Sequence, residues 1–218
     1  SMSDAEAAAF LNVYQTSYVG LVHNGRMQPG DIVLVHGGAG GVGLAAIQIA
    51  KAKGCTVIAT ASSEEKLAAC REQGADHVVN YAVEDFVQAV QEYTAGHGAD
   101  IIYDPVGGDV FDQSRRCIAF GGRLVVVGFA SGRIPEIAAN RILLRNFSLT
   151  GFTLHGYKAH RPQVLADSHA DLIQLHAAGQ VKPVISHTLP MSRLVEGIEL
   201  LETRRSIGKV VMVPGSLA

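Results

Sequence analysis

Short apolar segments alternate with longer amphipathic ones along most of this sequence. Residues 32–35 (IVLV) are wholly apolar, rich in branched side chains and followed by glycines, which is typical of a strand buried on both faces of a parallel sheet. The same pattern predicts six strands, near residues 32–36, 56–60, 77–80, 99–104, 122–127 and 148–152, with helices near 41–53, 63–73, 84–94 and 110–118. Strands joined by helices of this length imply right-handed crossovers, so we predict an α/β fold with a doubly wound parallel sheet.

Further elements are predicted at the two ends of the chain. Residues 3–22 are alanine-rich with apolar side chains at helical spacing, and Ser3 or Asp4 caps the predicted helix. Residues 158–179 are amphipathic and end at a glycine, which predicts another helix. The tail is predicted to form a strand (Val184–Leu189), a helix (Ser192–Glu202) and a strand (Lys209–Val213) that do not easily extend a six-stranded sheet. The chain thus divides into an opening helix (1–24), an α/β domain (25–180) and a C-terminal unit (181–218).

Composition and charge narrow the function classes. With 218 residues, 48% hydrophobic and 17% charged, the chain has the composition of an ordinary globular protein and not of a disordered one. A formal net charge of −2 gives no overall attraction to nucleic acid or acidic lipid, and no apolar stretch reaches the roughly 20 residues of a membrane span. Three widely spaced cysteines favour a reducing compartment, so we expect a cytoplasmic protein. Ser1 ahead of Met2 resembles a tag remnant, and no signal peptide follows it.

A glycine-rich loop, HGGAGGVG at residues 36–43, lies between the first predicted strand and the helix that follows it. Gly38, Gly40 and Gly43 satisfy the pattern G-x-G-x-x-G, in which the first glycine permits a tight turn, the second lets the backbone approach a pyrophosphate and the third lets the helix pack closely on the strand. The free N–H groups at the helix start then face the phosphates. Because the motif has the strand and the helix that it requires, we predict a dinucleotide-binding Rossmann domain in preference to a glycine-rich turn that binds nothing.

The residues after the second strand bear on the identity of the ligand. The glycines also fit the loop of short-chain reductases, but no tyrosine here has a lysine four residues later, as their catalytic pair requires. Ala61, Ser62 and Ser63 occupy the position where a methyltransferase or an NAD enzyme normally has an acid. Ser62, Ser63 and Lys66 instead offer hydroxyls and a cation to a 2′-phosphate, which favours NADPH over NADH. Ser63 also fits the N-cap of the next helix, with Lys66 on its solvated face, and both interpretations can hold together.

Several longer motifs together resemble one known family. They are GDIVLVHGGAGGVGLAAIQIAKAKG, VIATASSEEK, GADHVVNY, ADIIYDPVGGDVF, GGRLVVVGFASG and the closing IGKVVMVP. With these motifs, residues 10–214 resemble the zinc-independent quinone oxidoreductases of the medium-chain dehydrogenase/reductase superfamily, the branch that includes zeta-crystallin. The resemblance implies that the protein binds NADPH and transfers its hydride to a quinone or to the conjugated double bond of an enone or enal.

The resemblance also implies roles for individual residues. Gly41 and Val42 match the family's contacts to the pyrophosphate, and Lys66 and Tyr81 match its contacts to the 2′-phosphate end, although Tyr81 equally fits an ordinary strand-end tyrosine. The matches near the nicotinamide or at the cofactor cleft are Thr16, Phe129, Ala130, Phe152, Thr153, Leu154 and Arg204.

No catalytic residue is assigned from the sequence. The cofactor itself carries the hydride, so the protein mainly holds the nicotinamide against the acceptor in a water-poor site. Tyr18 and Tyr157 are candidates to meet the charge that develops on the acceptor oxygen, only because they lie near predicted cofactor loops.

The chain departs from the family in one large respect. Family members begin with a GroES-like barrel domain that covers the nicotinamide, and this sequence starts at the helix that follows it. The resemblance therefore implies a truncated chain that is inactive or feeble alone, with a tail (181–218) that would return to the barrel. It also implies a homodimer through the strand near residues 145–152, whose edge would otherwise be unprotected. The alternative function is a non-catalytic NADPH-binding regulatory or structural module.

Metal and serine-hydrolase chemistry are not expected. His169 and His176 would lie about 10 Å apart along their helix, too far for one metal ion, and we expect both on the surface. Cys55, Cys70 and Cys117 lie in or beside apolar segments and are expected to be small core residues. GFASG places its serine one position too late for the G-x-S-x-G elbow of a serine hydrolase.

Overall fold

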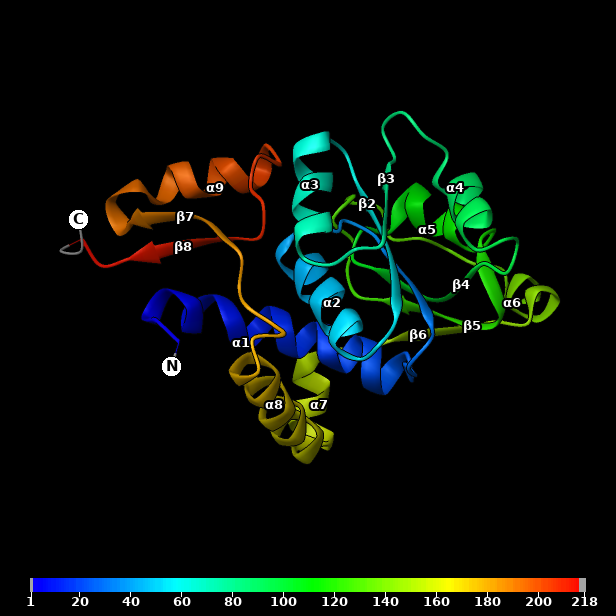
Figure 1. Cartoon of the computed structure of the whole chain (residues 1–218), viewed down its shortest axis with the longest axis horizontal. Coiled ribbons are helices and arrows are strands. Elements are labelled where there is room, and N and C mark those ends of the chain that lie inside the picture. The colour runs from blue at the N-terminus through cyan, green and yellow to red at the C-terminus, as the bar shows by residue number, and fades with distance from the viewer. Residues whose placement is uncertain (1, 216–218) are drawn as a thin grey trace.

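A six-stranded parallel sheet lies at the centre of the protein (Figure 1). The computed structural model describes residues 2–215, and the strands of this sheet are β1 (Ile32–Val35), β2 (Thr56–Ala61), β3 (His77–Asn80), β4 (Ala99–Asp104), β5 (Ile118–Val126) and β6 (Ser148–Gly151). Their order in space is β3-β2-β1-β4-β5-β6, and all neighbours run parallel. Between β1 and β4 the strand order reverses, and doubly wound sheets bind their ligands at such a switch point. The predicted doubly wound Rossmann sheet is confirmed.

Helices cover both faces of the sheet. They are α1 (Asp4–Tyr18), α2 (Gly41–Ala52), α3 (Glu64–Glu72), α4 (Phe86–Tyr93), α5 (Gly108–Ser114), α6 (Ala139–Arg145), α7 (Leu154–His160) and α8 (Pro162–Ala177), and a π-helical turn, η1 (Val19–Asn24), continues α1. Apolar side chains of α1, α2, α3 and α8 pack on one face, and those of α4, α5 and α6 pack on the other. Val33 and Val35 of β1 belong to the first layer and Leu34 to the second, and all three are fully buried, as predicted for a strand covered on both faces.

The predicted boundary between α5 and β5 is displaced. α5 ends at Ser114, not near residue 118, and β5 begins at Ile118, not near residue 122. An irregularity in the strand ladder explains the longer strand, because Ala99 pairs with Ile118 and the register then shifts before Ile101 pairs with Arg123. A bulge of this kind adds residues that interrupt the short apolar segment from which the strand was predicted.

The single long helix predicted over residues 158–179 is instead two helices. α7 ends at His160, Arg161 leaves the helical region with φ −143° and ψ 56°, and Pro162 begins α8. A proline disfavours helical backbone in the residue before it, which explains the break.

The tail forms a separate unit beside the main sheet. It consists of β7 (Ile185–Pro190), a short 3₁₀ turn, η2 (Met191–Arg193), α9 (Leu194–Glu202) and β8 (Lys209–Val213). β7 and β8 pair with each other in parallel and do not join the six-stranded sheet, as expected. Figure 1 shows this unit beside α1 and α3, on the side opposite β6 and α6. No GroES-like barrel lies within residues 2–215, and the division of the chain at residues 24 and 180 stays a prediction.

Gln48 of α2 links the tail to the helices of the main domain. Its side chain is buried, and its Oε1 accepts hydrogen bonds from the Tyr14 hydroxyl at 2.7 Å and from Lys182 N at 2.8 Å. Its Nε2 donates to Lys182 O at 2.9 Å and to Gln73 Oε1 at 2.5 Å. One side chain therefore holds α1, the end of α3 and the start of the tail in register with α2.

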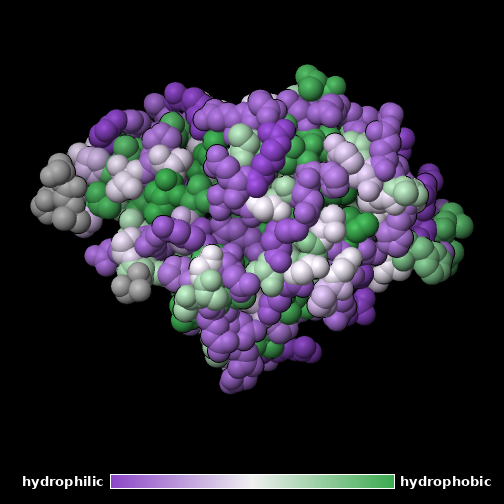
Figure 2. All heavy atoms as spheres, in the orientation of Figure 1, coloured by the Kyte–Doolittle hydropathy of each residue, from purple (hydrophilic) through white to green (hydrophobic). Residues whose placement is uncertain are grey.

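Apolar side chains reach the surface at two ends of the molecule. Figure 2 shows them over the tail unit and, at the opposite end, around α6. α6 was not predicted, because Leu143 and Leu144 are 72% and 67% exposed and a single apolar residue of the helix, Ile142, packs against the core. Within residues 2–215, no helix combines the length and the hydropathy needed to cross a membrane.

Candidate functional site

A cavity of about 550 Å³ opens at the switch point of the sheet, beyond the carboxyl ends of β1 and β4. Its walls come from the glycine loop, the end of β2, the turn between β4 and α5, the loop after β5 and the last turn of α9 with the residues that follow it. Segments that are far apart in the sequence therefore meet around one space. The described residues that line it include a single acidic one, Asp109, which pairs with Arg133 at 2.9 Å.

The glycine loop has the close packing that its motif requires, although the roles of its glycines differ from those expected. Gly37, with φ +59°, has the left-handed backbone, so the tight turn is made there and not at Gly38. A Cβ on Gly38 would lie 2.9 Å from Cys70 Sγ and 3.1 Å from Ala59 Cβ, so Gly38 permits close packing against α3 and β2. A Cβ on Gly43 would lie 2.3 Å from Gly37 O, so the third glycine lets α2 approach the loop, whereas close packing of the helix on the strand was expected.

The first turn of α2 faces this cavity with free N–H groups. Gly40 is the N-cap and supplies no side-chain cap, and the first hydrogen bond of the helix runs from Leu44 N to Gly40 O at 2.9 Å. The N–H groups of Gly41, Val42 and Gly43 precede that bond and have no carbonyl in the helix to bind. Because Gly40 and Val42 line the cavity, this end of the helix can bind an anion such as a pyrophosphate.

Ser62, Lys66, Tyr81 and Arg204 line one part of the cavity together. Lys66 Nζ donates to the backbone carbonyl of Arg204 at 2.6 Å, so the tail is attached directly to the residue predicted to bind a 2′-phosphate. Ser63 does not line the cavity and instead caps α3, where its Oγ accepts from Lys66 N at 3.5 Å. Two cations and two hydroxyls therefore line the space in which an NAD enzyme would present an acid.

The residues predicted near the nicotinamide are divided between two cavities. Ala130 lines the large cavity, whereas Phe152 and Thr153 line a second one of about 330 Å³ between β6 and α7. The Phe152 ring lies against Gly20 of η1, where a Cβ would approach it to 3.1 Å. Neither cavity is lined by Thr16, Phe129 or Leu154.

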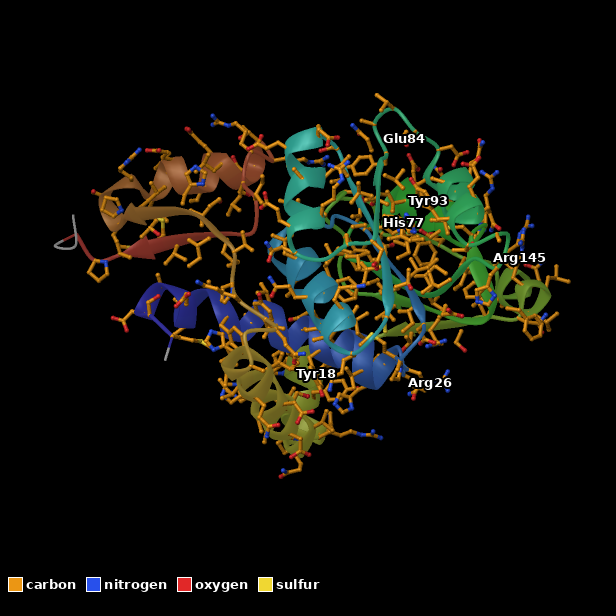
Figure 3. The ribbon with its side chains drawn as sticks, viewed as in Figure 1. Tyr18, Arg26, His77, Glu84, Tyr93 and Arg145 are labelled. Atoms are coloured by element: carbon orange, nitrogen blue, oxygen red, sulfur yellow. The ribbon has the colours of Figure 1, made fainter. Side chains whose placement is uncertain are left out.

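The two candidate tyrosines have different surroundings. The Tyr18 hydroxyl donates to the Asp171 carboxylate, and burial raises the pKa of this tyrosine well above its usual range. Figure 3 shows Tyr18 toward α8, and it lines neither cavity. Tyr157 lines the second cavity, and its oxygen accepts a hydrogen bond from Asn24 Nδ2 at 3.0 Å. Of the two, only Tyr157 is positioned to meet a small molecule.

Two buried polar residues near the large cavity were not singled out from the sequence. His36, directly before the glycine loop, bonds Thr60 and Ser114 through its two ring nitrogens. Asp104 ends β4, and its Oδ1 accepts from Val106 N at 2.8 Å and Gly107 N at 2.9 Å, which shapes the turn that lines the cavity. Burial raises the pKa of the Asp104 carboxyl. The available signal was a polar residue at the end of each apolar strand, where the strand meets a glycine-containing turn.

Residues 41–169, more than half of the chain, match the family described as zinc-binding dehydrogenases. The chain belongs to this family. It is similar to the quinone oxidoreductase-like protein 2 homolog of Nematostella vectensis, with 39% identity over 213 residues that cover 97% of this chain and 58% of that protein. It is also similar to a 2-haloacrylate reductase of a Burkholderia species, with 31% identity over 215 residues that cover 98% of this chain and 64% of that protein.

A solved structure of Escherichia coli quinone oxidoreductase complexed with NADPH superimposes with a TM-score of 0.90 at 30% identity, covering 98% of this chain and 66% of that one. Together these similarities place this zinc-binding dehydrogenase family member in the quinone oxidoreductase branch of the medium-chain dehydrogenase/reductase superfamily, as its motifs implied. The chain spans about three fifths of the length of the curated relatives it matches, 58% and 60% for two of them.

The family is described as zinc-binding dehydrogenases. Residues 2–215 nevertheless contain no group of three or more His, Cys, Asp or Glu side chains that could hold a metal ion. His169 is exposed, as expected, but His176 is partly buried edge-on against Phe10, with ring centroids 5.7 Å apart. The three cysteines are buried, and burial raises the pKa of the Cys55 thiol to about 11. They are core residues, as predicted from their apolar segments.

Proposed function

We propose that this chain is the NADPH-binding part of an oxidoreductase that transfers a hydride from NADPH to a quinone or to a conjugated carbonyl compound. The observation that carries the proposal is the arrangement of the large cavity. The free N–H groups at the start of α2 lie at one part of its wall, and Ser62, Lys66 and Arg204 line another part. The names of relatives, a quinone oxidoreductase complexed with NADPH and a 2-haloacrylate reductase, support the reaction class.

In this proposal the chain binds the cofactor along the walls of the cavity. Gly40, Gly41 and Val42 hold the pyrophosphate, while Gly38 and Gly43 let the loop and α2 come close enough to do so. The 2′-phosphate is held by Ser62, Lys66, Tyr81 and Arg204, with Ser63 fixing the start of α3. The residues proposed on the nicotinamide side are Thr16, Phe129, Ala130, Phe152, Thr153 and Leu154.

Bound NADPH would supply the hydride itself, so the chain's own residues contribute position and environment. The positive end of α2 and the Lys66 ammonium offset phosphate charge, and the apolar walls formed by Pro105, Val106 and Val110 exclude water from one side of the cofactor. The chain spans about three fifths of the length of its curated relatives, so turnover is proposed for the complete protein and not for this chain alone.

The proposal is tested by titrating the chain with NADPH and NADH and following nucleotide fluorescence. We expect micromolar binding of NADPH, much poorer binding of NADH, and a loss of more than tenfold in NADPH affinity in Lys66→Ala, equivalent to about 1.4 kcal/mol. NADH binding should change little in Lys66→Ala, because NADH has no 2′-phosphate. Lys182→Ala is the matched control, since Lys182 pairs with Glu6 at 3.4 Å and does not line the cavity. Equal affinity for the two nucleotides in the wild-type chain would contradict the proposed site.

Turnover is a separate measurement. With a barrel domain joined to the chain, NADPH oxidation in the presence of 1,2- or 1,4-quinones and of enones tests the enzyme. Bound NADPH with no turnover across these acceptors would favour the alternative, a regulatory or structural module.

We further propose a homodimer through the edge of β6. Strand β6 has a single neighbour, β5, in the six-stranded sheet, and the exposed apolar side chains of α6 lie immediately before it in the chain. A second copy would cover both features. The cytoplasmic location stays a prediction from the cysteines.

A further inference from the structure

His36 connects two walls of the large cavity across the end of β1. Its side chain is 1% exposed and lies directly before Gly37 and Gly38 of the loop. One ring nitrogen, Nδ1, is 3.0 Å from Thr60 Oγ1 at the end of β2, and the other, Nε2, is 2.8 Å from Ser114 Oγ on α5. One imidazole ring thus joins β2, a neighbour of β1 in the sheet, to α5.

The direction of each hydrogen bond follows from the partners. Ser114 Oγ also lies 2.6 Å from the carbonyl oxygen of Val110, which can only accept, so the serine hydroxyl donates there. Ser114 Oγ then accepts from Nε2–H of His36, and Nδ1 accepts the hydroxyl proton of Thr60. Burial lowers the pKa of His36 to about 3, so the ring is neutral at physiological pH and this order is fixed.

Both ends of this chain of bonds reach the cavity wall. The carbonyl of Thr60 accepts from Gly38 N at 2.9 Å, and the next two residues of the chain, Ala61 and Ser62, line the cavity. At the other end of the series, Val110 of α5 lines the cavity. The loop after β5 is held against the start of α5, because Gly108 N donates to Arg133 O at 3.1 Å. The part proposed to bind the adenosine and the part proposed to face the nicotinamide are therefore spaced by Thr60, His36 and Ser114.

We propose that His36 is a positioning residue that sets the separation between the two halves of the dinucleotide site. The inference rests on the proposed binding of NADPH and adds a residue that touches no part of the cofactor. A ligand that spans both halves gains affinity because its second half binds at a preset distance, whereas a ligand that fills one half gains nothing from that spacing.

The test compares whole and half ligands. Dissociation constants for NADPH and for 2′,5′-ADP, which carries only the adenosine end, are measured with wild type, Thr60→Val and Ser114→Ala. We expect NADPH to bind at least fivefold more weakly to both variants, while 2′,5′-ADP binding stays within twofold of wild type and shows that the variants are folded. Thr60→Ser keeps the hydroxyl and should restore NADPH binding.

Ser168→Ala is the matched control. Ser168 is buried like Ser114, donates to the carbonyl four residues earlier at the same 2.6 Å, and lies 3.4 Å from a histidine, His23, but it belongs to α8 outside the cavity. It should lower stability as Ser114→Ala does and leave NADPH affinity unchanged.

Each other outcome overturns the inference. Equal weakening of 2′,5′-ADP and NADPH would mean that the hydroxyls only support the adenosine wall, and unchanged NADPH affinity would mean that His36 has no part in spacing the site. If the wild-type chain binds 2′,5′-ADP and NADPH equally well, the second half of the dinucleotide site adds nothing to the affinity for NADPH, and its spacing from the first half has no effect. Failure of the wild-type chain to bind either ligand refutes the proposed function itself, and the inference with it.

Discussion

At the scale of single residues, the glycine loop depends on how closely backbone atoms approach one another. Gly43 allows α2 to contact Gly37 O at a distance where no Cβ fits, since the added carbon would lie 2.3 Å from that oxygen. Gly151 at the end of β6 differs, because a Cβ there would meet only Val126 atoms, at 3.9 Å and beyond. Two glycines beside candidate binding regions thus carry different constraints.

This difference predicts opposite tolerance to alanine. Gly43→Ala should lower the free energy of unfolding by about 2 kcal/mol or more, because the new methyl group forces α2 away from the loop. Gly151→Ala should change it by less than about 0.5 kcal/mol. Urea unfolding followed by circular dichroism gives both values, and similar losses in the two variants would argue against the close contact at Gly43.

The buried imidazole of His36 predicts a pH dependence. The unfolded chain takes up a proton on His36 near its ordinary pKa of 6.5, whereas the folded protein does so only near 3. The stability that comes from the neutral ring is present in full above pH 6.5 and is lost as the pH falls from 6.5 toward 3, by up to about 1.4 kcal/mol per pH unit.

Substituting His36→Gln removes this contribution. Over pH 6 to 4, the unfolding free energy of the variant should fall less steeply than that of wild type, with urea unfolding at several pH values as the measurement. Parallel slopes for the two proteins would show that His36 titrates alike in the folded and unfolded chain.

At the scale of elements, the helix starts differ in how well they are capped. Asp85 Oδ1 accepts from Val87 N at 2.8 Å and from Gln88 N at 3.3 Å at the start of α4. Ser63 at the start of α3 has a single, longer bond of 3.5 Å. The stronger cap belongs to α4, which has no residue in the lining of the large cavity.

Alanine at these two caps should therefore have unequal effects. Asp85→Ala should cost about 1 kcal/mol of stability, and Ser63→Ala only a few tenths. Thermal unfolding of both variants measures the difference. A cost at Ser63 equal to that at Asp85 would show that the capping interaction at α3 is tighter than its length indicates.

Burial constrains the sequence of several correctly predicted elements, although β6 was also predicted correctly and has no buried residue. β1 and β4 are apolar because both their faces are covered, so their sequence shows them directly. α6 escaped prediction because Leu143 and Leu144 face outward, and the extended start of β5 depends on pairing with Ala99, which no local pattern contains. The break before Pro162 could have been predicted, because the proline is visible in the sequence.

The candidate site was predictable to a similar degree. The glycine loop and the serines after β2 follow from local motifs, and the structure brings Gly40, Ser62 and Lys66 to one cavity. Ser206 of the tail also lines the large cavity, and its presence there depends on how a distant segment folds back, which sequence spacing does not show. The role of His36 depends on Ser114, 78 residues away, for the same reason.

At the scale of the whole molecule, the two ends of the sheet have different surroundings. Strands β3 and β6 both have an unpaired edge. Beside β3 the exposed apolar residue Val83 stands in a turn, whereas the exposed Leu143 and Leu144 of α6 precede β6. An edge with adjoining apolar surface is the one that a second copy can cover most favourably.

We therefore expect a dimer in sedimentation velocity, and a monomer when Leu143→Glu and Leu144→Glu are combined. Both side chains are already exposed, so the double variant should fold with unchanged circular dichroism. Val83→Glu, 80% exposed at the other end of the sheet, should remain dimeric. A wild-type chain that sediments as a monomer would refute the proposed interface.

The bond from Lys66 Nζ to the Arg204 carbonyl has a consequence for redesign and for evolution. An acidic residue at position 66, a change that removes the cation proposed for the 2′-phosphate, would place a negative charge near that carbonyl oxygen and repel the tail. In the proposed site, cofactor preference and the placement of the C-terminal unit are thus coupled at one side chain, Lys66. A variant that exchanged NADPH for NADH would need a compensating change in the tail, so the two properties should alter together among descendants of this sequence.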